Sequence, residues 1–170
     1  TFFATIGPID VAAMFAALTS GVSAKKRRHT AVRGVLIAGA ILLAFALLGE
    51  FILNVMGISL AALRAAGGVL LLLIGIDLVT VKGSGATTTT SDEDLEAEER
   101  SDIAVFPLAT PLIAGPGAIG AVILLMAHAD GDFLEQGAVI ISLLLVLVMT
   151  LLSLLLASRL QNWLGVTGMH

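Results

Sequence analysis

The stretch FPLATPLIAGPGAIG, residues 106–120, holds three of the four prolines in this chain. A proline inside a helix removes a backbone hydrogen-bond donor and clashes with the preceding turn, so this stretch cannot form one straight helix. It contains the dipeptide Gly115-Pro116, and the other Gly-Pro of the sequence, Gly7-Pro8, lies 108 positions earlier. The same two-residue signal therefore occurs once in each half of the chain.

A second pair of landmarks has the same spacing. The two asparagines of the chain, Asn54 and Asn162, are also 108 positions apart, and NVMGIS at 54–59 recurs as NWLGVT at 162–167. Outside these landmarks the two halves share little beyond their apolar character. Because Asn and Gly-Pro are rare in this sequence, their common offset indicates a duplicated unit.

The composition indicates what kind of unit was duplicated. Hydrophobic residues make up 58% of the chain and charged residues 13%, with a mean hydropathy of +1.04, whereas soluble domains have about 25% charged residues. The lipid bilayer is therefore the expected partner. About 20 apolar residues cross its core, and unbroken apolar runs favour helices over the alternating strands of a barrel. Five runs qualify as spans: 2–19, 31–53, 59–81, 103–128 and 137–158.

Counting the spans predicts the symmetry of the fold. The two Gly-Pro sites lie in spans one and four, so each unit contains three spans, and an odd number inverts the second unit in the membrane. We therefore predict an all-α, polytopic helical membrane protein, an inverted 3+3 repeat with broken helices 1 and 4. Its parts are a first three-helix repeat at 1–81, an acidic cytoplasmic linker at 82–102 and a second repeat at 103–170. The counterpart of span three would begin at 167, so we expect the complete protein to add a start and a sixth helix.

Basic residues predict the orientation. The connection after span one holds KKRR at 25–28 and Arg33, the connection after span three holds Lys82 and Arg100, and Arg159 follows span five. The two opposite connections contain no Lys or Arg. By the positive-inside rule the basic connections are cytoplasmic and the N-terminus lies outside, in a multi-pass inner-membrane protein. Two other interpretations of KKRR, a nucleic-acid patch and an anionic-lipid patch, are not needed once topology explains it, and we predict no nucleic-acid partner.

The Gly-Pro sites form the candidate binding site. Helix breaks at membrane depth persist where they are buried in protein or face a watery cavity. One interpretation makes them packing kinks. The other makes each broken span a pair of half-helices, whose exposed backbone N–H and C=O groups bind a zwitterionic or charged small solute. The second interpretation gives these substrate-binding residues: Gly7, Pro8, Asp10, Thr110, Pro111, Gly115, Pro116 and Gly117.

Charged residues inside the predicted spans are few. Asp10 follows Pro8 by two positions, and an isolated carboxylate at that depth is costly. It is interpreted as a cap of the second half-helix, as a site for a coupling ion such as H⁺ or Na⁺, or as unexplained. Its counterpart in the second repeat is Ala118. Glu50 and Arg64 each lie seven residues from Gly57, which predicts either a structural ion pair or an outer gate.

Three stretches, IGPIDVAAMFAALTSG at 6–21, GISLAALRAAGG at 57–68 and FPLATPLIAGPGAI at 106–119, resemble the MarC family. This family comprises small six-span inner-membrane proteins of bacteria and archaea that are classed as neutral amino acid transporters. The resemblance covers essentially the whole chain. It implies small neutral amino acids such as glycine or alanine as substrates, and it places Gly7-Pro8 and 115–117 at the transport site. The chain departs from the pattern by having Gly7 where many members have Asp or Asn, and by lacking the sixth span.

Two classes of function follow. The first is a secondary transporter of small neutral amino acids coupled to protons or cations, with a passive channel as its closest rival. The second is a non-transporting membrane protein, either a scaffold or an intramembrane enzyme. His29, His128 and His170 do not cluster within a span, and the sequence contains no nucleophile–base pair, metal-ligand motif or phosphate-binding loop. We therefore predict a transporter that is not an enzyme and uses no metal or cofactor.

Overall fold

The computed structural model describes residues 1–19, 21–80, 103–129 and 132–167, and the predicted linker at 82–102 falls outside this part. The described residues form helices joined by short turns. In chain order the helices are α1 (Phe2–Ile6), α2 (Pro8–Leu18), α3 (Ala24–Met56), α4 (Leu60–Thr80), η1 (Ala104–Ile113), α6 (Pro116–His128) and α7 (Phe133–Thr167). The prediction of an all-helical protein is confirmed.

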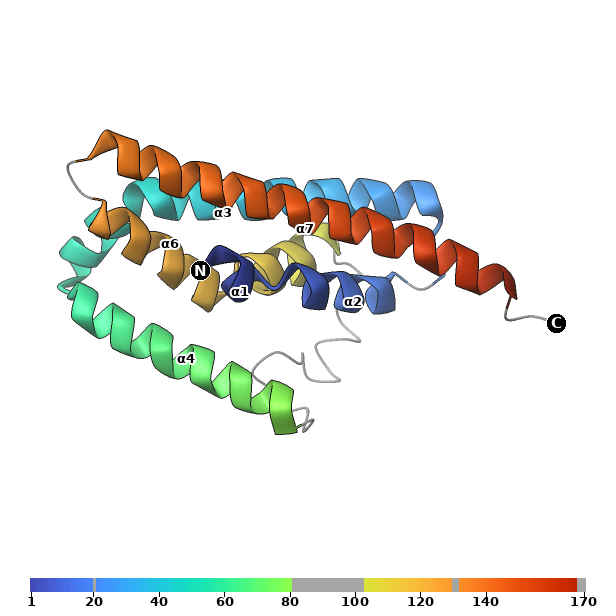
Figure 1. Cartoon of the computed structure of the whole chain (residues 1–170), viewed down its shortest axis with the longest axis horizontal. Coiled ribbons are helices and arrows are strands. Elements are labelled where there is room, and N and C mark those ends of the chain that lie inside the picture. The colour runs from blue at the N-terminus through green and yellow to red at the C-terminus, as the bar shows by residue number, and fades with distance from the viewer. Residues whose placement is uncertain (20, 81–102, 130–131, 168–170) are drawn as a thin grey trace.

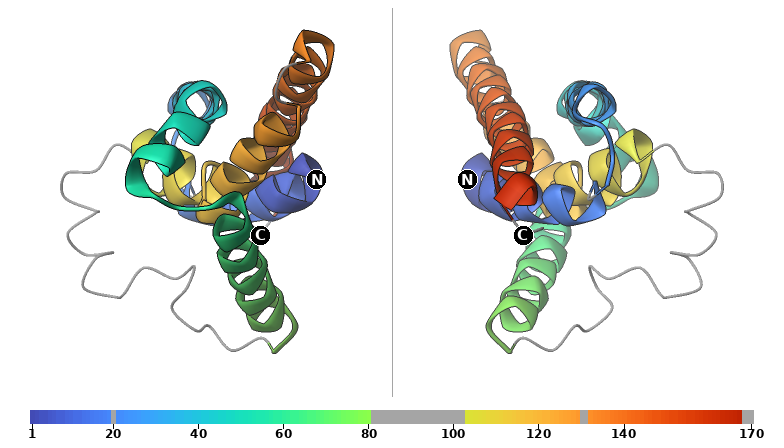
Figure 2. Two further views of the ribbon diagram at one scale, coloured as in Figure 1. Left: turned by 90° about the vertical axis from the view of Figure 1, so that its left-hand side faces the viewer. Right: turned by 90° about the vertical axis from the view of Figure 1, so that its right-hand side faces the viewer.

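Two long helices, α3 and α7, pack against each other and run in opposite directions (Figure 1). The segment from α1 to α2 and the segment from η1 to α6 also run in opposite directions. α2 packs on α7, whereas η1 and α6 pack on α3. α4 packs on α6 and projects away from the other helices (Figure 2). The two long helices, α3 and α7, therefore pack against both proline-containing segments.

Two helices are long and apolar enough to cross a membrane on their own. They are α3, with 33 residues, and α7 over its first 27 residues. η1 and α6 together make a third candidate, with a bend of 56° between them, and α1 with α2 forms a shorter apolar segment. By length and composition, the described residues thus contain two or three candidate spans. This agrees with a helical membrane protein, in which each span needs about 20 apolar residues.

The turn between α3 and α4 is built from local hydrogen bonds. Gly57 ends α3 with a φ of 68°, in the left-handed region that suits glycine. Its N–H donates to the backbone O of Asn54 at 3.1 Å. Ser59 Oγ accepts the N–H of Ala62 at 3.1 Å, which caps the first turn of α4. The motif NVMGIS therefore reverses the chain at the predicted place.

Both long helices extend beyond the apolar runs that predicted them. α3 begins at Ala24, so KKRR at 25–28 and Arg33 are helical and do not form a loop. Lys and Arg are good helix formers, and extending an existing helix avoids the cost of nucleation. α7 continues to Thr167, so Gly165 does not end a helix as Gly57 does. A glycine inside a helix costs only about 1 kcal/mol, which a continuing helix tolerates.

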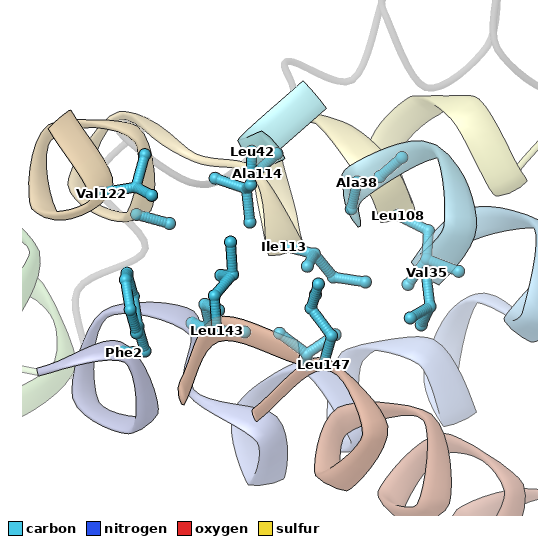
Figure 3. Close-up of a cluster of buried hydrophobic side chains, with 14 of the residues drawn as sticks. Phe2, Val35, Ala38, Leu42, Leu108, Ile113, Ala114, Val122, Leu143 and Leu147 are labelled. Carbon is cyan, nitrogen blue, oxygen red and sulfur yellow. The ribbon is translucent and has the colours of Figure 1, made fainter. Parts of the chain in front are cut away.

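The core lies where α3, η1 and α7 meet. Figure 3 shows Ile113 of η1 among side chains of the two long helices, with Val35 on one side and Leu147 on the other. Ile113, Leu42 and Leu143 are fully buried. Lipid tails are as apolar as these side chains, so the helices are held together by close packing rather than by exclusion of water.

Glycines on α3 allow its neighbours to approach closely. A Cβ atom on Gly34 would lie 2.5 Å from Leu108 Cδ2, and a Cβ atom on Gly49 would lie 2.5 Å from Ile123 Cγ1. The side chains of Leu108 and Ile123 therefore occupy the space that a larger residue on α3 would need. α3 holds η1 through Gly34 and α6 through Gly49.

We predict that Gly34→Val lowers the free energy of unfolding by about 1–3 kcal/mol, the usual effect of overpacking. The new side chain would meet Leu108 and the backbone O of Ala104, which lies 3.1 Å from the Cβ position. Thermal unfolding of the purified protein in detergent measures the loss. The control is Gly137→Val on α7, where an added Cβ meets no atom within 4 Å. Equal losses in the two variants would contradict the packing role of Gly34.

Candidate functional site

The first Gly-Pro site lies between α1 and α2. Gly7 adopts the left-handed conformation, with φ 59° and ψ 63°, and its N–H donates to the backbone O of Phe3 at 3.1 Å. Pro8 then occupies the first position of α2, where a missing N–H removes no intrahelical bond. Most side chains are strained at the φ of Gly7, although Asn and Asp tolerate this left-handed region, and a Cβ there would lie 3.0 Å from Asp10 Oδ2. One helix ends and another begins at this dipeptide.

The second Gly-Pro site lies between η1 and α6. Pro116 occupies the first position of α6, and Gly115 before it is extended, with φ −81° and ψ 171°. A Cβ at position 115 would lie 2.5 Å from the backbone O of Pro111. Upstream, Phe106 and Thr110 are extended within η1, as expected for residues that precede proline. Glycine thus permits a close backbone approach at 115, whereas at 7 it suits a left-handed backbone conformation.

Each of the two sites contains an equivalent backbone hydrogen bond, and the residues of the two bonds are 108 positions apart. The N–H of Val11 donates to Gly7 O at 2.9 Å, and the N–H of Ile119 donates to Gly115 O at 3.0 Å. Each second half-helix therefore starts from a glycine carbonyl. The first backbone N–H groups of a helix have no partner within that helix. After each proline they belong to these residues: Ile9 and Asp10 in α2, and Gly117 and Ala118 in α6.

The packing brings the two sites to the same level. α1 packs on α6, and α2 packs on η1, in segments that run in opposite directions. α2 and α6 both begin at this level and run away from each other (Figure 1). Their N-terminal ends, which carry the positive ends of the helix dipoles, therefore lie at the same level. The C-terminal ends of α1 and η1 bring backbone carbonyls to this level.

The predicted binding residues differ in their exposure. Pro8 and Gly117 are buried, whereas Gly7, Thr110 and Gly115 are half-buried. The remaining three are exposed: Asp10, Pro111 and Pro116.

Two of these side chains have polar groups with defined surroundings. Thr110 Oγ1 donates to the backbone O of Val105 at 3.1 Å, within its own segment. Asp10 lies in the first turn of α2, where a carboxylate complements the positive end of the helix dipole. The remaining polar groups at the two sites belong to the backbone.

A hollow of about 380 Å³ lies apart from the Gly-Pro sites, between α1, α6 and α7. None of the predicted binding residues lines it. Its lining carries hydroxyl groups but no charge, and Ser142 donates its hydroxyl to Ala138 O of the same helix at 2.7 Å. The lining residues are Thr1, Phe2, Phe3, Leu125, Ala138, Val139, Ser142 and Val146.

The predicted ion pair falls partly outside the described structure. Glu50 is exposed near the end of α3, whereas the side chain of Arg64 is not among those described. The ion pair, and its alternative as a gate, therefore stay predictions. Within the described ranges, no group of three His, Asp or Glu side chains is placed to hold a metal ion.

Comparison with known proteins identifies a family that the chain matches. The chain matches the MarC family integral membrane proteins over residues 1–170. It is 42% identical, over its whole length and 82% of the relative, to UPF0056 membrane protein MJ1677 of Methanocaldococcus jannaschii. It is 34% identical, over its whole length and 80% of the relative, to UPF0056 membrane protein YvbG of Bacillus subtilis. Over 71% of this chain and 56% of the relative it is 36% identical to Escherichia coli YhcE. No solved structure matches the chain.

We predict that Gly115→Ala lowers the free energy of unfolding by about 1–3 kcal/mol, because the added Cβ meets a backbone carbonyl that cannot rotate away. Gly120→Ala on α6 is the control, since a Cβ there meets no atom within 4 Å. Alanine is a better helix former than glycine, so the control should be neutral or stabilised. Thermal unfolding in detergent compares the two, and a neutral Gly115→Ala would contradict the close approach at Pro111.

Proposed function

We propose that this chain, which belongs to the MarC family of integral membrane proteins, is a secondary transporter of small neutral amino acids of the glycine and alanine class. The observation that carries the proposal is that two helices begin at the same level of the molecule, at the counterpart Gly-Pro sites. Each site offers backbone N–H groups beside backbone carbonyls. A zwitterion carries one group of each complementary charge, so it suits such a site better than a simple ion does.

One residue pair supports an inverted repeat. Leu147 Cδ1 lies 3.3 Å from the position of a Cβ on Gly39, and residues 39 and 147 are counterparts at the offset of 108. A residue that contacts its own counterpart lies on the axis that exchanges the two halves. Because α3 and α7 run in opposite directions, this axis crosses them, as an axis in the membrane plane would.

Helix contacts support the same exchange. α2 packs on α7 and its counterpart α6 packs on α3, while η1 packs on α3 and its counterpart α1 packs on α7. Counterpart residues on the long helices also agree in burial: Val35 and Leu143 are both buried, and so are Leu42 and Thr150. We therefore propose the inverted 3+3 arrangement, with the spans that contain the Gly-Pro sites broken at midplane depth.

The proposed site is not symmetric. Asp10 lies in the first turn of α2, whereas its counterpart in α6 is Ala118, which is buried and has no polar side chain. We propose that the substrate carboxylate lies at the start of α6, where only backbone N–H groups are present. In this proposal the carboxylate of Asp10, at the start of α2, faces the ammonium group of the substrate or a coupling cation such as H⁺ or Na⁺. The backbone groups of Gly7, Gly115 and Gly117 line the site.

The orientation follows from the charges. Lys25, Lys26 and Arg28 lie at the start of α3, and Arg159 lies near the end of α7. We propose that this end faces the cytoplasm, with the N-terminus outside, in the inner membrane of a bacterial or archaeal cell. We propose no enzymatic reaction, cofactor or metal for this site.

We predict that the protein, in proteoliposomes, concentrates labelled glycine or alanine when an ion gradient is imposed. The gradient supplies the free energy, so a collapsed gradient should reduce uptake to equilibration. Uptake that equilibrates equally with and without the gradient would indicate a passive channel. No uptake of any small neutral amino acid, by protein shown to be inserted and folded, would indicate a non-transporting scaffold.

We predict that Asp10→Asn abolishes the dependence of uptake on an imposed proton gradient, because the amide has no proton to exchange. Uptake at several external pH values measures the effect. Glu135→Gln is the control, since Glu135 is exposed at the start of α7, away from both Gly-Pro sites. Normal, gradient-driven uptake by Asp10→Asn at every pH would remove the coupling role and leave the carboxylate as a helix-terminal charge.

A further inference from the structure

We propose that one end of the α3–α7 pair binds anionic phospholipid headgroups. This basic end consists of four exposed side chains, Lys25, Lys26 and Arg28 at the start of α3 and Arg159 near the end of α7. The start of α3 and the end of α7 lie on the same side of the molecule, seen face-on in the right-hand view of Figure 2. This proposal does not depend on what the protein transports.

The spacing of charges places the basic end at the headgroup level. In α3, Arg28 and Glu50 are 22 positions apart, or about 33 Å along the helix. In α7, Glu135 and Arg159 are 24 positions apart, or about 36 Å. A bilayer core is about 30 Å thick. Because the two helices run in opposite directions, both put cations at one surface of the core and carboxylates at the other.

The cations of the basic end are not neutralised within the described ranges. Lys25, Lys26, Arg28 and Arg159 form no ion pair with another described residue. The carboxylates whose side chains the structure describes lie elsewhere, at Asp10, Glu50, Asp132 and Glu135, and the side chain of Asp77 in α4 is not among those described. Topology explains which side of the membrane holds the cations. It does not require them to be exposed and without an ion pair to another described residue, an arrangement that suits contact with lipid phosphates.

A phospholipid fits this surface better than a nucleic acid does. Arg28 follows Lys25 by three positions, and Leu36 follows Lys25 by eleven. At 3.6 residues per turn, these spacings place the three residues on one face of α3. Leu36 is 68% exposed. Cations at the headgroup level are thus followed along the same face by an apolar side chain at the level of acyl chains. A lipid can contact both, whereas a nucleic acid would contact only the cations.

Tryptophan quenching by brominated lipids in nanodiscs tests the proposal. Trp163, the single tryptophan of the chain, follows Arg159 by one helical turn and reports on α7. A Leu36→Trp, Trp163→Phe variant reports on α3. Each juxtamembrane cation strengthens attachment to an anionic surface about fivefold. We therefore expect brominated phosphatidylglycerol to bind at least fivefold more tightly than brominated phosphatidylcholine at both reporters, and the preference to weaken in concentrated salt.

Charge-neutralising variants decide the result. Lys25→Gln, Lys26→Gln and Arg28→Gln combined should reduce the preference at the α3 reporter to less than twofold, and Arg159→Gln should do so at Trp163. Glu135→Gln is the matched control and should leave both unchanged. Equal binding of the two lipids, or a preference that survives neutralisation, would overturn the proposal. Binding of a labelled oligonucleotide to phosphatidylcholine nanodiscs, without any lipid preference, would assign the surface to nucleic acid.

Discussion

Every backbone N–H and carbonyl group at membrane depth needs a partner, because the hydrocarbon supplies none. Pro8 and Pro116 have no N–H to donate. At these two positions the chain meets this constraint by placing each proline at the first position of a new helix, directly after the glycine that is the N-cap of that helix. The second segment is also interrupted upstream of Gly115, because Pro107 and Pro111 lie inside η1, where Phe106 and Thr110 are extended. The first N–H groups of α2 and α6, which have no partner within their own helices, lie at one level of the molecule.

The rest of the fold can be understood as support for these two interruptions. A half-helix such as α1, with five residues, is too short to be stable alone and must be held by its neighbours. α3 holds η1 and α6 through Gly34 and Gly49, and α7 holds α2. The two long helices meet at Gly39 and Leu147. Small residues at these crossings matter because helices in lipid associate through close packing.

The sequence predicted the elements well because they depend on local properties. Apolar runs correctly predicted that the described segments are helical, whereas the offset of 108 that the Gly-Pro and Asn landmarks indicate stays a prediction. The helical state of KKRR was missed, since hydropathy ends a span at a charge whereas backbone hydrogen bonding does not. The reason for Gly115 was also missed, because the carbonyl of Pro111 approaches it only in the folded chain. The contact between Gly39 and Leu147 could have been sought from the offset, but small and apolar residues are too common here to single out a pair.

The central claim is that the two halves are inverted relative to each other, and the sidedness of one counterpart pair tests it most directly. The chain has no cysteine, so Lys26→Cys and Leu134→Cys each introduce a single thiol, at exposed positions 108 residues apart. A membrane-impermeant maleimide applied to sealed, oriented vesicles should label these two counterparts from opposite sides of the membrane. Labelling of both from the same side would contradict the inverted repeat.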